Sequence, residues 1–451
     1  MRSEDVRIGK SFGWLMVFVT ALFGANMSTT DLRGDSMNYA AISNNVLYNQ
    51  DPLILTLNGE LYMNKPPLFF WINALFIKFF GANAFSVKLS TLLAVLLIAY
   101  FLYRIAMELF DDENIAVMLP VLFFATYVVY KNTQMLKLEA LVTAFMIGAV
   151  YFFIRYIREQ SLTYVFLTGI CSGLAVFVKG PLGFVPLIGI FLYPIMNREI
   201  LSGRYYLHFI VIALVSVIIP GWWFGYVIAN TPFYETFFLE QIVDRVGDNS
   251  INVTGTTYFQ RPVWAYLLYM LKYGGYFVIL FLYGFYRMRK DGKLSDQVKY
   301  ILLAGAIYTV IIHFITTREH RYLYQFYLFF WIVGAYGLSC FVKKGFSSFV
   351  KYAAIVLMLF VVIYPGKMNW NTYTILQDAK KIADENNLPV VAQSQYISDI
   401  SDKAAMTFFL RGSLKEPPAE GKWLEVVHKS KRLDGVELFL TRRIRVYIMG
   451  E

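Results

Sequence analysis

The stretch GELYMNKPPLFFWINALFIKFFG, from Gly59 to Gly81, joins a polar opening to a long apolar segment. The apolar half suits a lipid bilayer, yet it is preceded by Asn64, Lys65 and two prolines. Proline is tolerated in the first turn of a helix, where the backbone N–H that it lacks has no partner within the helix. We therefore predict a helix over residues 66–80 that lies along a membrane surface and begins beside a lysine.

The composition of the whole chain is that of an integral membrane protein. Of its 451 residues, 57% are hydrophobic and only 16% are charged, whereas soluble domains carry about 25% charged residues. Aromatic residues make up 18%, as expected where Trp and Tyr gather at both membrane interfaces. Basic loops and anionic lipid or phosphate ligands explain the net charge of +10, so we expect no nucleic-acid partner.

Membrane spans need about 20 mostly apolar residues, and on this rule the chain contains about eleven. They lie near residues 11–30, 84–104, 115–131, 138–155, 162–178, 182–197, 205–228, 262–286, 298–315, 322–342 and 349–365. A second surface helix is expected over Met37–Tyr48, so that two interfacial helices lie in the first outer loop. The first span follows basic residues, as the core of a signal peptide also does, but we expect it to be retained.

The tail changes character after residue 365. Apolar and polar residues alternate over 423–427 and 435–440, and the stretch 378–387 has helical character. We therefore predict an α-helical polytopic membrane domain over residues 1–365. A small α/β domain outside the membrane is predicted over residues 366–451.

Four basic clusters set the expected orientation, because Lys and Arg concentrate in cytoplasmic loops. They are Arg155/Arg158, Arg198/Arg204, Arg287/Arg289/Lys290/Lys293 and Lys343/Lys344/Lys351. With these clusters in the cytoplasm, the loops 30–83 and 230–261 and the tail lie outside. We expect a multi-pass protein of the cytoplasmic (inner) membrane whose site faces the exterior or periplasm.

Several charged residues on the predicted outer face break the positive-inside bias. Ionisable groups at membrane depth are costly, which makes them candidates for a functional site. Carboxylates that face Lys and Arg at one level suit a site that holds a phosphate and activates a nucleophile. The candidates are Lys65, Lys131, Lys137, Lys179, Arg245, Arg261, Arg318 and Arg321, with Asp35, Glu60, Glu139, Glu240 and Asp244.

Some of these residues also have a structural explanation. Lys131 and Lys137 are equally well explained as anchors that extend from span ends toward the headgroups. Asp35 follows a glycine and opens a helix, so it is also a candidate N-cap. His313 and His320 are too isolated to predict a metal site.

Five motifs in order resemble the membrane glycosyltransferases of the GT-C superfamily. Within that superfamily the motifs look like those of the lipid A aminoarabinose transferases and their protein O-mannosyltransferase relatives. The resemblance covers about residues 31–327. The motifs are GDSMNYAAISNNVL, LNGELYMNKPPLFFWINALFIKFFGANAFSVKL, QMLKLEALVTAF, GLAVFVKGPLGFVP and PGWWFGYVIANTPFYETFFLEQIVDR.

The chain departs from the family pattern at several positions. After Asp35 it lacks the family's second acid and arginine, and Asn64 replaces the acid before Lys-Pro-Pro. Glu139 stands where Asp is commoner, and Gln241 where His is frequent. Direct matches are Asp35, Tyr39, Lys65 and Lys179. The core chemistry therefore carries over, while aminoarabinose and lipid A as substrates do not.

The resemblance implies transfer of a sugar from a polyprenyl-phosphate donor, such as one on undecaprenyl phosphate, to a lipid, glycan or protein acceptor. It implies Asp35 as the catalytic base in an inverting displacement, with Glu139 as a second catalytic or sugar-binding carboxylate. The residues expected to bind the donor phosphate or substrate are Lys65, Tyr39, Lys179, Arg245, Arg261 and Arg321. No nucleotide site or other cofactor is expected, a divalent metal stays an open alternative, and we expect a monomer in contact with membrane lipids.

Three other functions remain open on the sequence alone. A flippase or transporter of lipid-linked sugars would also need outer charges and a lipid groove, but with polar residues near mid-span. A polysaccharide ligase would carry paired Arg and His in a large outer loop, a pattern only faintly present over residues 318–321. A scaffold or sensor would use the tail as its main surface and would tolerate the loss of Asp35.

The orientation generates the first prediction. In a variant from which Cys171 and Cys340 have been removed, cysteines placed at Asn83 and Lys429 should react with a membrane-impermeant thiol reagent in intact spheroplasts. A cysteine at Lys290 should react only after permeabilisation. Labelling at Lys290 with protection of the other two positions would reverse the orientation.

Overall fold

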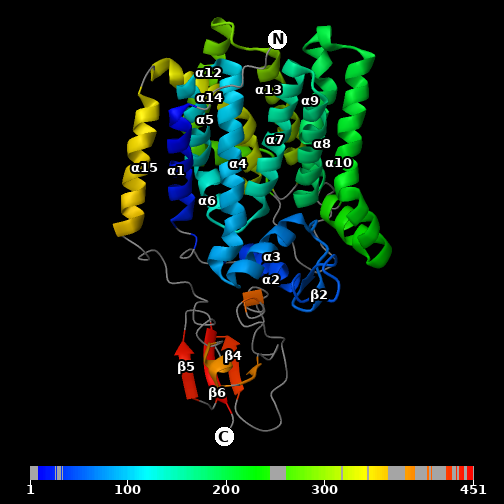
Figure 1. The fold of residues 1–451 in the computed structure, drawn as a ribbon, viewed down its shortest axis with the longest axis vertical. Coiled ribbons are helices and arrows are strands. Elements are labelled where there is room, and N and C mark those ends of the chain that lie inside the picture. The colour runs from blue at the N-terminus through cyan, green and yellow to red at the C-terminus, as the bar shows by residue number, and fades with distance from the viewer. Residues whose placement is uncertain are drawn as a thin grey trace.

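The computed structural model describes most of the helical region and part of the tail. The described residues are 9–25, 27, 32, 34–243, 261–315, 318–342, 345–363, 381–386, 388–391, 404–405, 408, 423–428, 433, 436–440 and 444–449. They form a helical bundle, a surface layer at one end of it and a small β-sheet beyond that layer (Figure 1).

Seven of the described helical segments are long and apolar enough to cross a membrane, so the chain is a polytopic helical membrane protein. They are α4 (Ala84–Phe110), α7 (Leu138–Glu159), α8 (Leu162–Lys179), α10 (Gly203–Asn230), α12 (Ala265–Lys290), α13 (Asp296–Phe314) and α14 (Leu323–Phe341) with the 3-10 turn His320–Tyr322 before it. Shorter apolar helices occupy the other predicted ranges, so the count of about eleven spans stays a prediction. They are α1 (Lys10–Gly24), α9 (Val185–Leu192) with the 3-10 turn Pro181–Phe184 before it, and α15 (Phe346–Ile363).

The predicted span at 115–131 is bent in the structure. The structure divides it into α5 (Glu113–Ala125) and α6 (Tyr127–Thr133), which meet at an angle of 71°. Thr126 has an extended backbone at the break. Its hydroxyl donates to the Leu122 carbonyl at 3.0 Å and accepts from the Trp331 indole at 2.7 Å, so a distant tryptophan stabilises the bend.

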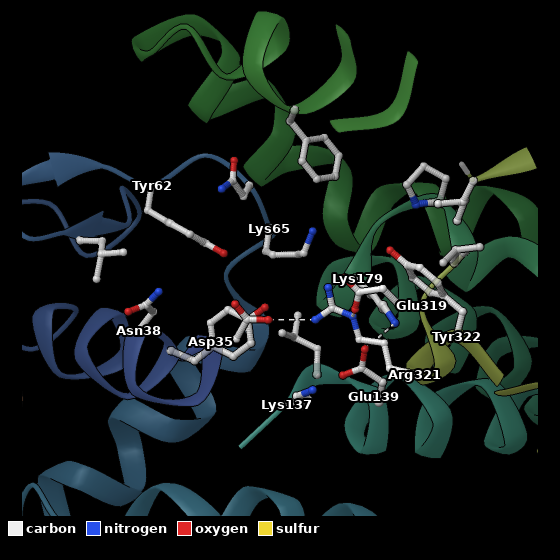
Figure 2. Close-up of a pocket in the computed structure, with 18 of the residues that line it drawn as sticks. Asp35, Asn38, Tyr62, Lys65, Lys137, Glu139, Lys179, Glu319, Arg321 and Tyr322 are labelled. Carbon is white, nitrogen blue, oxygen red and sulfur yellow. Dashed lines mark hydrogen bonds and ion pairs between the residues drawn. The ribbon is translucent and has the colours of Figure 1, made fainter. Parts of the chain in front are cut away.

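Helices α7 and α14 form the centre of the bundle. Of their most apolar segments, 83% and 78% of residues are buried, against 28% in α10 and 22% in α12. The two peripheral helices therefore present most of their surface to lipid. Glu139, in the first turn of α7, and Arg321, in the turn just before α14, lie on the same cavity next to the surface layer (Figure 2).

A buried ion cluster joins α4 to α7 at the opposite end of the bundle. The Glu108 carboxylate, 2% exposed, lies 3.1 Å from Arg155 and 3.9 Å from Arg104, and it also pairs with Arg158. A carboxylate buried at that depth requires such partners. One predicted basic cluster therefore also holds two helices together.

The surface layer lies across the other end of the bundle (Figure 1). It contains α2 (Asp35–Asn45), the short antiparallel strands β1 (Thr56–Leu57) and β2 (Glu60–Leu61), and α3 (Leu68–Phe80). The Tyr39 ring packs edge-on against Phe69 and Phe70, with ring centres 5.9 and 5.7 Å apart. These aromatic contacts hold the two predicted surface helices against each other.

Two boundaries of the surface helices differ from the prediction. Helix α2 begins at Asp35, two residues before the predicted start, and ends at Asn45. Helix α3 begins at Leu68, because Pro67 is its N-cap and does not lie inside the first turn. Lys65 therefore belongs to the segment that leads into the helix and not to the helix itself.

The tail contains four described strands in the order β3-β4-β6-β5. They are β3 (Val390–Val391), β4 (Trp423–His428), β5 (Val436–Leu440) and β6 (Ile444–Met449); β3 and β4 are parallel and the other pairs antiparallel. Strands thus occupy both segments that the alternating pattern indicated. Figure 1 shows the sheet on the side of α2 and α3, while a separate domain outside the membrane stays a prediction.

Candidate functional site

A cavity of about 1270 Å³ opens between the surface layer and the ends of the bundle helices. Figure 2 shows side chains from α2, from the segment before α3 and from the ends of α7, α8 and α14 pointing into it. The charged residues that line it are Asp35, Glu60, Lys65, Lys137, Glu139, Lys179, Glu319 and Arg321. Four carboxylates and four cations thus share one cavity at the level expected from the sequence.

Asp35 lies at the start of α2 and is not the N-cap, so the capping alternative is wrong. The N-cap is Gly34, whose φ of +51° favours glycine, and no side chain caps this end of the helix. The Asp35 carboxylate accepts from Arg321 Nη1 at 2.9 Å, while Arg321 Nε lies 2.6 Å from Glu319. With its side chain 48% exposed, the carboxylate is open to a ligand in the cavity.

Glu139 and Lys179 form a buried ion pair. The Lys179 ammonium lies 3.1 Å from the Glu139 carboxylate, and the two side chains are only 9% and 6% exposed. Glu139 is in the first turn of α7 and Lys179 is the last residue of α8. The ammonium also lies 5.6 Å from the centre of the Tyr322 ring, so Lys179 is enclosed by one carboxylate and one aromatic face.

The Glu139 end of α7 is fixed by a further contact in the core. Gln325, 1% exposed, donates to the Glu139 carbonyl at 3.4 Å and to the Thr143 hydroxyl at 3.1 Å. The Tyr308 hydroxyl lies 2.9 Å from the Gln325 amide oxygen. These contacts fix the backbone at the start of α7, and with it the Glu139 side of the buried ion pair.

Lys65 points into the cavity from the segment that precedes α3 (Figure 2). Pro66 and Pro67 behind it are both buried, which fixes the backbone that carries the lysine. Tyr39 lines the same cavity from α2. Burial, and to a lesser degree Tyr62 and Asp35, raises the pKa of the Tyr39 phenol well above its ordinary value, so the phenol stays neutral as a hydrogen-bond donor.

One wall of the cavity is apolar and reaches the lipid-facing surface. It is formed by the turn before α9, by α9 itself and by the end of α13. Ile188 and Phe314 contribute to this wall while 40% and 61% of their surface is exposed. The other apolar lining residues here are Leu182, Phe184, Ile311 and Ile315.

The structure brings together six of the eight predicted site residues. Asp35, Tyr39, Lys65, Glu139, Lys179 and Arg321 all line the cavity. Arg261 does not line it; its guanidinium lies 3.5 Å from the Arg318 carbonyl and 6.0 Å from the Tyr269 ring centre. Arg245 lies outside the described residues.

Some other residues that line the cavity were not assigned a binding role from the sequence. Tyr62 precedes Lys65 by three positions inside the quoted motif, so the motif itself contained the signal. Glu319 lies two positions before Arg321 and had no signal of its own, while Lys137 was equally well explained as an anchor. In the described part of the chain, no three His, Cys, Asp or Glu side chains gather in a way that would hold a metal ion.

The fold and the cavity define a polytopic membrane protein with a charged site under a layer of surface helices. Residues 64–223 match the family described as Dolichyl-phosphate-mannose-protein mannosyltransferase. Among solved structures, the chain is similar to ArnT from Cupriavidus metallidurans bound to undecaprenyl phosphate, with a TM-score of 0.73. That likeness covers 97% of this chain and 98% of that one at 14% identity, so it shows the fold.

Other relatives agree with this likeness. The archaeal oligosaccharyltransferase AglB from Archaeoglobus fulgidus, in complex with an inhibitory peptide and a dolichol-phosphate, matches with a TM-score of 0.50. Its match has 14% identity and covers 89% of this chain and 64% of that one. The resemblance to GT-C membrane glycosyltransferases predicted from the sequence is confirmed.

Two curated relatives match over part of their length. An undecaprenyl phosphate-alpha-4-amino-4-deoxy-L-arabinose arabinosyl transferase of Erwinia tasmaniensis is 26% identical over 246 residues, 52% of this chain and 42% of that protein. An uncharacterized protein of Aquifex aeolicus is 28% identical over 209 residues, 45% of this chain and 41% of that protein. The aligned part of this chain thus spans less than half the length of these relatives.

The buried pair generates the second prediction. Lys179→Met should lower the melting temperature of the detergent-purified protein, because it leaves the Glu139 carboxylate buried without its ammonium, at a cost of about 3–5 kcal/mol. The double variant Glu139→Gln/Lys179→Met removes both charges and should recover most of the loss. Equal melting temperatures for the single variant and the wild type would show that the pair does not stabilise the fold.

Proposed function

We propose that this chain is a glycosyltransferase that transfers a sugar from a polyprenyl-phosphate-linked donor to a lipid, glycan or protein acceptor. The observation that carries the proposal is a cavity into which Asp35 at the start of α2 and Lys65 from the segment before α3 both project, beside a wall that continues to the lipid-facing surface. A polyprenyl phosphate has the same two parts, an anionic headgroup and an apolar chain. The likeness to a structure with undecaprenyl phosphate supports the same ligand class.

In this proposal the donor phosphate lies near Lys65 and Tyr39. An ammonium offers three donors to phosphate oxygens, and the neutral Tyr39 phenol offers one more. The isoprenoid lies along the apolar wall formed by α9 and the end of α13. The sugar then occupies the polar part of the cavity, between the phosphate and Asp35.

Asp35 is the proposed catalytic base. Its carboxylate takes the proton of the acceptor hydroxyl while that oxygen attacks the anomeric carbon and the bond to phosphate oxygen breaks. Attack and departure on opposite faces of the sugar invert the anomeric configuration. No covalent intermediate with the enzyme is required.

The buried ion pair has a positioning role in this proposal. Glu139 neutralises Lys179, and the pair fixes the ends of α7 and α8 beside the substrate. Arg321 orients Asp35 through their ion pair, which replaces the general phosphate-binding role expected for it. We assign Arg261 to holding the chain near Arg318 and not to the phosphate.

The proposed setting is the outer face of the cytoplasmic membrane. In Figure 1 the surface layer lies at the end of the bundle opposite the α12–α13 loop, which carries the largest basic cluster. The positive-inside rule then directs the cavity to the exterior or periplasm. We also propose that residues 1–365 form the catalytic domain, that 366–451 form a small domain on the same side, and that the protein acts as a monomer.

A flippase or transporter of lipid-linked sugars is less well supported. Such proteins place substrate-binding polar groups near the bilayer midplane. The charged residues of this cavity instead lie in loops or at helix ends on one side. That arrangement suits chemistry at the headgroup level.

The base assignment generates the third prediction. Asp35→Asn keeps the shape of the side chain but cannot accept a proton, so transfer should fall by at least about a hundredfold. Donor binding and melting temperature should stay near those of the wild type. The measurement is release of polyprenyl phosphate from a lipid-linked sugar donor by membranes that contain the purified chain.

Glu139→Gln is the matched control for that experiment. It should reduce transfer less than Asp35→Asn, since Glu139 is paired with Lys179 and positions it. A dead Glu139→Gln enzyme beside a normal Asp35→Asn enzyme would move the base to Glu139. Normal transfer by both variants would refute direct displacement with either base.

Lys65 generates the fourth prediction. Lys65→Ala should weaken binding of undecaprenyl phosphate and abolish most transfer, because it removes a charge from the phosphate site. Lys65→Arg should restore only part of the activity, since a planar guanidinium replaces a compact ammonium. Wild-type turnover in Lys65→Ala would show that the Lys-Pro-Pro segment has only a structural role.

A further inference from the structure

The cavity cations differ in how they are neutralised. Lys179 is paired with Glu139, and Arg321 is paired with both Asp35 and Glu319. Lys137 also lines the cavity, directly before α7, but its ammonium donates to the neutral Asn132 amide oxygen at 3.2 Å. Within the described residues, no carboxylate lies within ion-pair distance of Lys137.

The position of Lys137 is not that of a headgroup anchor. Figure 2 shows it on the side of the cavity that holds Asp35 and Glu139, and it is half-buried. Burial lowers the pKa of Lys137 below its ordinary value; Arg321 lowers it further, while Glu139, Asp35 and Glu319 raise it. An anion that enters the cavity would therefore stabilise the charged form of this lysine.

The proposed reaction creates an extra negative charge in this cavity. The donor is a phosphodiester with one negative charge. When the acceptor oxygen bonds to the anomeric carbon, the electron pair of the broken bond stays on the phosphate oxygen and the acceptor proton passes to Asp35. The polyprenyl phosphate that leaves is a monoester with up to two negative charges, because its second pKa is about 6.

We propose that Lys137 is a second phosphate-binding residue of the cavity, which neutralises the charge that the leaving polyprenyl phosphate gains as the glycosidic bond breaks. This inference rests on the proposed function. An interaction that is stronger in the transition state than in the bound substrate accelerates the chemical step. Lys65 then serves the donor in both states, and Lys137 acts mainly on the charge that develops.

The test compares two probe ligands at pH 8 with the purified full-length protein. One is undecaprenyl phosphate, a dianion at that pH, and the other is its methyl phosphodiester, a monoanion. The wild type should prefer the dianion. Lys137→Gln should reduce that preference by about tenfold or more, because one charge-assisted contact is lost, whereas Lys137→Arg should keep most of it.

Lys131→Gln is the matched control. Lys131 lies six residues earlier, is exposed over the Tyr127 ring and does not line the cavity, so its removal should leave the preference unchanged. A preference that is the same in Lys137→Gln and in the wild type would overturn the inference, and so would an equal loss of affinity for both ligands. If the wild type binds neither ligand, the proposed function itself fails.

Discussion

A charge at the edge of the hydrocarbon layer needs an opposite charge beside it, and the arrangement of this site follows from that constraint. Lys179 ends α8 and Glu139 lies in the first turn of α7, so their ion pair holds the adjoining ends of two neighbouring helices together. Helix α7 lies at the centre of the bundle and α14 beside it. The floor of the cavity is thus built on a buried pair that cannot separate without leaving a bare charge.

The surface layer adds the other half of the site. Aromatic contacts of Tyr39 with Phe69 and Phe70 hold α2 against α3, which brings Asp35 and Lys65 to the same cavity. These two residues are thirty positions apart in sequence, Asp35 at the start of α2 and Lys65 in the segment that leads into α3. The packing behind Asp35 and Lys65 fixes their backbone, so that both side chains are held in place at the membrane surface.

Sequence patterns could identify candidate site residues that are marked by their immediate neighbours in the chain. Lys65 before two prolines and Asp35 after Gly34 were identified from their motifs, and the long apolar segments gave the bundle. Contacts between distant parts of the chain could not be predicted this way. Arg321 reaches Asp35 across 286 positions, and Trp331 stabilises the bend at Thr126, yet neither pairing has a sequence spacing that would indicate it.

The same limit explains why Arg261 was expected in the cavity and why the role of Lys137 stayed open from the sequence. Arg261 was expected at the phosphate because it is a cation on the outer face, but charge alone does not say which way a side chain points. Lys137 had the signature of an anchor at a span end, and only the fold shows that it lines the cavity. For a lysine at a span end, burial distinguishes a headgroup anchor from a ligand-binding residue. Burial depends on the tertiary structure, so the sequence alone could not decide between the two roles.

Two ion pairs of the cavity, Glu139 with Lys179 and Asp35 with Arg321, differ in exposure, and on the proposed function the first supports the structure while the second takes part in the chemistry. The pair of Glu139 and Lys179 is buried, so a ligand cannot exchange for either partner at low cost. The pair of Asp35 and Arg321 is partly exposed, and exposed pairs contribute only about 0–1 kcal/mol. An arriving phosphate or sugar hydroxyl can therefore compete for Arg321 or Asp35 without unfolding the site.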